Sequence, residues 1–249
     1  MISSQEIQEN LYSLYEDIAA SGLATSGTAG GCRIIRHLAS AWPNMVYPGG
    51  TAARPDIAAL VESVKANHCP RLMLFEEGMV TEDVMEEMNG FRFVPAAQWI
   101  NMVASISEDR EERRQLDCRV VDIRDPAEWK DWSSVAEEVL FKKEKLAADL
   151  FTYGCEKGLF KLLTGYYGDQ AVGTTLLYRG KLAGVYMVAT LPSFQGKGLA
   201  KELMRFTGSI AAAEGYTSLV LHSTKAGMGL YERLGYRSAG KLLLYYCMT

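Results

Sequence analysis

A glycine-rich turn between an apolar run and an amphipathic segment is the feature of this chain best suited to chemistry. The stretch 188–204 reads Val-Ala-Thr-Leu-Pro-Ser-Phe-Gln-Gly-Lys-Gly-Leu-Ala-Lys-Glu-Leu-Met. Gly196 and Gly198 carry no side chain, so backbone N–H groups there can approach an anion closely, and the free amides of a following helix add to them. Each such hydrogen bond to a charged phosphate contributes about 1.5–3 kcal/mol. The stretch predicts a phosphate-binding junction between a strand and a helix over Gln195 to Ala213.

Two common nucleotide-binding fingerprints do not fit this junction. The pattern G-x-G-x-x-G requires a third glycine where Lys201 stands, and a P-loop requires Ser or Thr where Gly198 stands. On this motif alone, a tight strand-to-helix turn without a ligand stays open as an alternative.

The segment Gln-Gly-Lys-Gly-Leu-Ala over 195–200 resembles the pyrophosphate-binding signature of the GNAT superfamily of N-acetyltransferases, in which Arg or Gln is followed by x-x-Gly-x-Gly or Ala. A second element of that family is a helix with a tyrosine, placed after the next strand. The segment Leu-Tyr-Glu-Arg-Leu-Gly-Tyr over 230–236 resembles it, with 218–222 as the intervening strand. The resemblance covers roughly residues 115 to 249.

The resemblance implies acetyl-CoA as cosubstrate and assigns roles to these residues. A splayed strand would offer backbone groups to the pantetheine amides at Val188, Ala189 and Thr190. The turn and helix start would hold the pyrophosphate at Gln195, Gly196, Lys197, Gly198, Leu199 and Ala200. Tyr231 would be the general acid that protonates the departing thiolate of coenzyme A, with packing on the sheet as the alternative reading, and Tyr236 is assigned to the core.

The sequence does not identify a general base for the attacking amine. The candidates from loops or strand ends are Glu156, Asp169 and His222. Three tyrosines could line an acceptor pocket, namely Tyr153, Tyr166 and Tyr167.

Composition narrows the class of protein. The 249 residues are 48% hydrophobic, which is enough to bury a sizeable core. The 26 basic and 30 acidic residues are interspersed and give a net charge of −4, so neither nucleic acid nor a membrane is an expected partner. The N-terminal segment has no basic start and apolar core, and no apolar run approaches the 18 or so residues of a membrane span, so a cytoplasmic protein is expected. The five cysteines are odd in number and widely spaced, so reduced, mostly buried thiols are expected, without a disulfide framework or a metal site.

Periodicity and turn residues predict two units. In the first, we expect helices over 5–20, 56–67 and 81–88, a Gly/Thr/Ser segment over 21–31, and strands over 42–47, 71–75 and 91–103. In the second, we expect a strand over 118–123, helices from Asp125 and over 142–154, and a hairpin of 171–178 with 182–190. The charged run 107–114 is the expected boundary, which divides the chain into 1–112 and 113–249.

The two units show a weak internal repeat. The segment 71–102 parallels 218–248 in its order of strand, helix, glycine and strand. The first unit lacks the phosphate signature at 46–51, and the position matching Tyr231 falls among Val84, Met85 and Glu86. Tandem GNAT proteins with one degenerate copy are known, and the resemblance suggests that arrangement, with a chance match of such units as the alternative. The expected fold class is therefore α/β (α+β), with a mixed, mostly antiparallel GNAT-type sheet flanked by helices in two related halves.

These observations predict an acyltransferase that moves acetyl from acetyl-CoA to a primary amine by direct attack in a ternary complex. The degenerate N-terminal half would shape the acceptor site. The alternative is a non-catalytic acyl-CoA-binding or structural module, which the lack of an obvious base favours and the presence of Tyr231 disfavours. The acceptor, a small molecule or a peptide amine, and the oligomeric state are not indicated.

Overall fold

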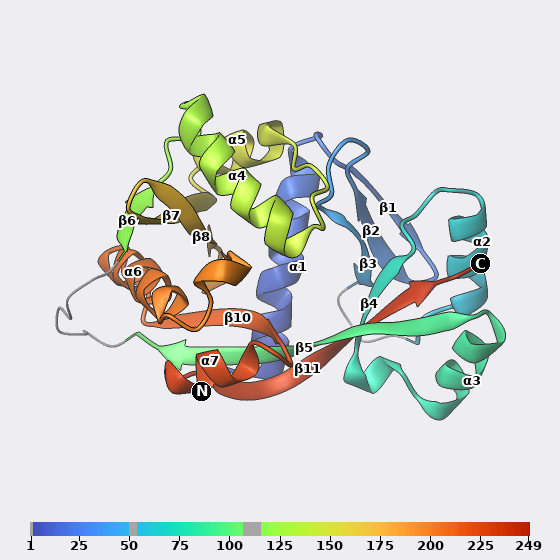
Figure 1. Ribbon diagram of the computed structural model, residues 1–249. Coiled ribbons are helices and arrows are strands. Elements are labelled where there is room, and N and C mark those ends of the chain that lie inside the picture. The colour runs from blue at the N-terminus through green and yellow to red at the C-terminus, as the bar shows by residue number, and fades with distance from the viewer. Residues whose placement is uncertain (1, 50–53, 107–115) are drawn as a thin grey trace.

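The computed structural model describes residues 2–49, 54–106 and 116–249, and its strands form one mixed sheet of 11 strands in the order β1-β2-β3-β4-β11-β5-β10-β9-β8-β7-β6 (Figure 1). The strands are β1 Thr25–Ala29, β2 Cys32–Arg36, β3 Asn44–Pro48, β4 Leu72–Glu76, β5 Phe93–Ser105, β6 Asp117–Val120, β7 Phe160–Tyr167, β8 Gln170–Arg179, β9 Ala183–Thr190, β10 Ser218–Thr224 and β11 Arg237–Cys247. The helices are α1 Ser4–Ala20, α2 Ile57–Lys65, α3 Glu82–Gly90, α4 Pro126–Leu140, α5 Ala148–Glu156, α6 Leu199–Ala213 and α7 Met228–Arg233, with short 3-10 helices at Glu77–Met79 and Pro192–Phe194. The predicted fold class, a mixed and mostly antiparallel sheet flanked by helices, is confirmed.

The same order of elements occurs twice along the chain. In the first half it runs β1-β2-β3-α2-β4-α3-β5, and in the second half β7-β8-β9-α6-β10-α7-β11. In each half one pair of strands is parallel, β3 with β4 and β9 with β10, and the other pairs are antiparallel. The internal repeat of the sequence therefore corresponds to a repeat of strands and helices.

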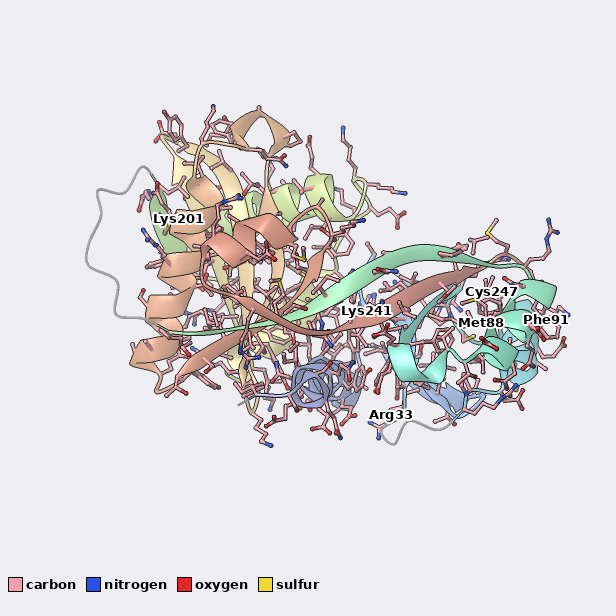
Figure 2. The ribbon with its side chains drawn as sticks, turned by 90° about the horizontal axis from the view of Figure 1, so that it is seen from below. Arg33, Met88, Phe91, Lys201, Lys241 and Cys247 are labelled. Carbon is pink, nitrogen blue, oxygen red and sulfur yellow. The ribbon has the colours of Figure 1, made fainter. Side chains whose placement is uncertain are left out.

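The two halves exchange their last strands. β11 of the second half lies between β4 and β5 of the first half, and β5 in turn pairs with β10 of the second half. Figure 2 shows β5 and β11 side by side, with Lys241 midway and Cys247 beside Met88 and Phe91 of the α3 region. Each half thus needs a strand of the other to complete its sheet. The division into 1–112 and 113–249 stays a prediction, because its boundary over 107–114 lies outside the described residues.

Helices cover both faces of the sheet. One face packs against α1, α4 and α5, whose apolar side chains form a shared core with fully buried Trp132 and Phe151 at its centre. The other face is covered by α2 and α3 over the first half and by α6 and α7 over the second half. Because α1 packs on β5 and β11, it lies over the exchanged strands in the middle of the molecule (Figure 1).

Local sequence accounts for several helix ends. Ser3 and Glu6 form a capping box at the start of α1, and the Asp125 side chain accepts a hydrogen bond from the backbone N–H of Ala127 at the start of α4. α6 ends where Gly215 adopts a φ of +90°, which glycine takes without a steric penalty. The predicted helix over 5–20 is confirmed, and its predicted apolar face is buried.

Some local elements differ from those that the sequence predicted. The Gly/Thr/Ser segment over 21–31 follows the first helix as expected, but it also contains β1, a strand without an apolar pattern that pairs with β2. The helix predicted over 142–154 begins only at Ala148, because Lys142 and Lys143 have positive φ angles that interrupt a helix. The helix predicted from Gln195 begins at Leu199. β7 was not predicted at all, although it lies between β6 and β8.

None of the helices in the described part of the chain is both long enough and apolar enough to cross a bilayer. The five cysteines all lie in the described part of the chain and form no disulfide there, and Cys32, Cys69 and Cys247 are buried. Within residues 2–49, 54–106 and 116–249 there is no group of three or more His, Cys, Asp or Glu side chains that could hold a metal ion.

Candidate active site

The parallel strands β9 and β10 pair only at their beginnings. Ala183 pairs with Leu219 and Gly184 pairs with Val220, and no further ladder pairs join the two strands among the described residues. Beyond this point Val188, Ala189 and Thr190 lie on the part of β9 that has β8 as its only ladder partner. Backbone N–H and C=O groups that are left without a ladder partner need other hydrogen-bond partners, so this opening suits a ligand that itself carries amides.

A bulge in β9 accompanies the opening. Between the pairs Thr174–Ala189 and Leu176–Tyr186, two residues of β9 oppose one residue of β8. Met187 takes a φ of +49° there, and its carbonyl oxygen accepts a hydrogen bond of 3.0 Å from Thr174 Oγ1. Bulges redirect a strand and often stand beside active sites, and this one turns the end of β9 away from β10.

The glycine-rich turn follows at the end of β9. Gly196 and Gly198 have φ angles of +76° and +82°, and an added Cβ at either position would meet no atom within 4 Å. The N-cap of α6 is Gly198 itself, so no side chain caps the helix start. Within the described residues, the N–H groups of 196–200 have no recorded acceptor. The turn therefore presents free amides to open space at the positive end of a helix, as an anion requires.

The side chains of the turn are partly engaged in holding its shape. Gln195 Nε2 donates a hydrogen bond of 3.1 Å to the carbonyl oxygen of Thr190, which ties the turn back to β9. The Lys197 ammonium lies 4.7 Å from the centre of the Phe194 ring. The Tyr167 ring also packs against the Phe194 ring, with centroids 5.6 Å apart. Leu199 is buried, whereas Gln195, Gly196, Lys197 and Gly198 are exposed. An anion in this turn would thus meet backbone amides first and the lysine second.

The corresponding helix of the first half is closed to an anion. At the start of α2 the Asp56 carboxylate accepts a hydrogen bond of 2.9 Å from the N–H of Ala59. The Asp56 N–H donates to the carbonyl of Gly30, so the β1–β2 turn rests against the same helix end. A carboxylate already stands at the start of α2, where it would repel an anion, whereas no side chain caps the start of α6.

Tyr231 lies on α7, directly after the open end of β10. Its side chain is buried with 8% exposed, and burial raises the pKa of its hydroxyl to about 12. An added Cβ at Gly227 would lie 3.3 Å from the Tyr231 ring and 3.1 Å from Ser223 Oγ, which places the ring against the last residues of β10. The hydroxyl is therefore protonated at neutral pH, as a proton donor must be.

His222 belongs to a hydrogen-bonded chain under α1. Its Nδ1 lies 2.8 Å from Asn101 Oδ1, and Asn101 Nδ2 donates to Ser4 Oγ over 2.9 Å. Its ring stacks on Tyr186 of β9, with centroids 6.1 Å apart, across the opening between the two strands. Burial lowers the pKa of His222 to about 3, so the ring is neutral.

The other side chains predicted for base and acceptor roles lie apart from Tyr231. Glu156 and Tyr153 are on α5, which Figure 1 shows well separated from α7. Asp169 is exposed in the β7–β8 turn. Tyr166 donates a hydrogen bond of 2.9 Å to Asp131 of α4. Of the three candidate bases, the structure brings only His222 to the opening between β9 and β10.

Comparison with known proteins agrees with this geometry. Residues 160–238 match the family described as "Acetyltransferase (GNAT) domain". Residues 160–238 are similar to a GNAT acetyltransferase domain. The matched residues include β9, the glycine-rich turn, β10 and Tyr231. Among curated proteins no sequence matches this chain.

Solved structures share the fold of nearly the whole chain at low identity. A GCN5-related N-acetyltransferase from Kribbella flavida is 14% identical, with a TM-score of 0.68 over 96% of this chain and 95% of that one. A functionally unknown conserved protein from Staphylococcus epidermidis is also 14% identical, with a TM-score of 0.61 over 89% and 93%. A GCN5-related N-acetyltransferase from Sphaerobacter thermophilus is 12% identical, with a TM-score of 0.59 over 87% and 80%. The fold of both halves together therefore occurs in other proteins.

From the sequence we expected the N-terminal half to shape the acceptor site, but we could name none of the residues that this half contributes. Asn101 and Trp99 come from β5, and Trp99 packs near His222 at a ring distance of 6.2 Å. No local sequence pattern marks Trp99 or Asn101 as a site residue. They lie beside β10 because β5 and β11 are exchanged between the two halves.

Proposed function

We propose that this protein transfers acetyl from acetyl-CoA to a primary amine by direct attack in a ternary complex. The observation that carries the proposal is the separation of β9 from β10 after Gly184, directly ahead of a turn whose amides are free. The strand opening fits the amide-bearing pantetheine arm, and the turn fits the pyrophosphate. Val188, Ala189 and Thr190 would bind the former, and residues 195–200 the latter.

In the proposed reaction the amine nitrogen attacks the thioester carbonyl carbon and forms the new C–N bond. The C–S bond then breaks, and its electron pair leaves on sulfur. Tyr231 gives its hydroxyl proton to that sulfur. The sulfur, whose thiol has a pKa of about 8.5, leaves more readily when it is protonated as the C–S bond breaks. The nitrogen loses its extra proton to a base or to water.

A primary amine is the acceptor class that we propose, either on a small molecule or on a peptide. The basic and acidic residues are interspersed and the net charge is −4, so the composition indicates neither a nucleic acid nor an anionic lipid surface as the acceptor. Acyl-CoA binding without turnover is the competing function. It is favoured because neither candidate carboxylate base, Glu156 or Asp169, lies beside Tyr231.

The test is release of coenzyme A thiol from acetyl-CoA in the presence of single amines, such as glycine, spermidine and a lysine-containing peptide. Tyr231→Phe keeps the packing ring and removes the donor, so we expect unchanged affinity for acetyl-CoA and a rate about 10²–10⁴-fold lower in single-turnover kinetics. Tyr245→Phe is the matched control, because Tyr245 of β11 is also buried but packs in the core of the first half, away from α7. Binding of acetyl-CoA without thiol release with any amine would favour the non-catalytic alternative.

A further inference from the structure

Tyr236 carries a buried hydroxyl without a partner. Within the described residues, three buried side-chain atoms lack a hydrogen bond, namely Thr164 Oγ1, His222 Nε2 and the Tyr236 hydroxyl. Tyr236 is 6% exposed and stands at the start of β11, directly after α7. Its ring meets the Tyr231 ring edge to face, with centroids 5.6 Å apart and planes at 68°. The unpartnered hydroxyl therefore belongs to a ring that contacts the ring of the proposed acid.

Packing alone does not account for this hydroxyl. Burial of a hydroxyl without a partner costs about 1–3 kcal/mol, whereas phenylalanine would fill almost the same space without that cost. An unsatisfied buried group of this kind calls for an explanation, and a role in a reacting state is one of them. The hydroxyl is consistent with a donor whose acceptor exists only during the reaction.

The backbone fixes Tyr236 relative to Tyr231. The N–H of Tyr236 donates a hydrogen bond of 3.0 Å to the carbonyl oxygen of Tyr231, and the chain turns between them at Gly235, where φ is +83°. Both rings pack in the same apolar cluster with Leu199 and Leu203 of α6. One turn and one cluster thus hold the two rings as neighbours.

Tyr231 is the group beside Tyr236 on which negative charge would develop. When Tyr231 gives its proton to sulfur, its oxygen becomes a phenolate on a side chain that is only 8% exposed. A hydrogen-bond donor beside that oxygen would stabilise the charge strongly, because a buried charge has few water partners. Burial and the nearby Tyr231 raise the pKa of Tyr236 well above its ordinary value, so this hydroxyl keeps its proton.

We propose that Tyr236 is a positioning residue for the acid, whose hydroxyl donates a hydrogen bond to the Tyr231 oxygen as that oxygen gives its proton to the sulfur of coenzyme A. This inference rests on the proposed function. The two hydroxyls make no hydrogen bond with each other in this structure, so the bond belongs to the reacting state. No atom is transferred to or from Tyr236, and solvent later returns a proton to Tyr231.

The test is a double-mutant cycle on the full chain with acetyl-CoA and whichever of the amines named above wild type acetylates fastest, with the rate without protein subtracted. Tyr236→Phe is expected to unfold at the same or a higher temperature, to bind acetyl-CoA as wild type does, and to release thiol about tenfold or more slowly in a single turnover. In the Tyr231→Phe background the same substitution is expected to cause no further loss, because the phenolate no longer forms. Thr164→Val is the matched control, since it removes another unpartnered buried hydroxyl, on β7, and should leave the rate unchanged.

Three results would overturn the inference. They are an unchanged rate for Tyr236→Phe, a loss of acetyl-CoA affinity that accounts for its slower rate, and a full further loss in the Tyr231→Phe background. Failure of the proposed function looks different. In that case wild type releases no thiol, or Tyr231→Phe reacts as fast as wild type whatever stands at position 236.

Discussion

Asn101 of β5 and His222 of β10 are joined by a hydrogen bond of 2.8 Å between Oδ1 and Nδ1. Because the Asn101 amide group donates to Ser4, its oxygen accepts from the Nδ1–H of His222. Asn101 is fully buried, and it comes from the half of the chain that lacks the phosphate turn. This contact therefore links the N-terminal half to the strand that borders the candidate active site.

Replacement of Asn101 by leucine should destabilise the whole protein. It leaves His222 Nδ1 and Ser4 Oγ without partners, so we expect a loss of about 2–4 kcal/mol in the free energy of unfolding. Ser4→Ala removes only the outer hydrogen bond and should cost about 0.5–1.5 kcal/mol. Chemical denaturation measures both. Equal effects of the two substitutions would mean that the contact with His222 adds nothing to stability.

His222 should make stability depend on pH in the mildly acidic range. Its folded-state pKa of about 3 lies below the ordinary 6.5, so the unfolded chain binds a proton that the folded chain does not. Stability is then fully present above about pH 6.5 and falls with decreasing pH by up to about 1.4 kcal/mol per pH unit. His222→Gln should flatten the curve of unfolding free energy between about pH 7 and pH 5, whatever its effect at neutral pH. Parallel curves for wild type and variant would contradict the assignment of a neutral buried ring.

Gly198→Asp should abolish binding of acetyl-CoA while the fold is retained. The new carboxylate would stand in the open space before α6 and repel the pyrophosphate. Gly198→Asn is the control, because asparagine has nearly the same shape, tolerates the positive φ and carries no charge. Thermal stabilisation by acetyl-CoA is the readout, and the Asp variant should show none while the Asn variant keeps a part of it. If acetyl-CoA stabilises the Asp variant as much as wild type, the phosphate site lies elsewhere.

Acetyl-CoA should bind once per chain. The start of α6 is uncapped, whereas Asp56 caps the start of α2 with a negative charge. Isothermal titration of the full chain should give a stoichiometry of about one, and the Gly198→Asp variant should give no binding heat. A stoichiometry of about two, or heat that persists in the variant, would place a second site in the first half.

The sequence by itself determined the local parts of the site. Gly196 and Gly198 specify a turn with positive φ because other residues pay a steric penalty there, and the position of Tyr231 ahead of a glycine turn follows from the chain order. Apolar spacing likewise determined α1, the two hairpin strands β8 and β9, and the repeat of strand and helix units. These features depend on neighbours along the chain, so a pattern of residue types is enough to reveal them.

Only the tertiary structure decided which strands meet. The alternation of apolar residues tells which face of a strand is buried, but it does not name the strand's partner, so the exchange of β5 and β11 left no signal. The bulge at Met187, the strand β1 without an apolar pattern, and the contact of Asn101 with His222 all follow from pairing between distant segments. For the same reason the unpartnered hydroxyl of Tyr236 could be found only once the atoms around it were placed.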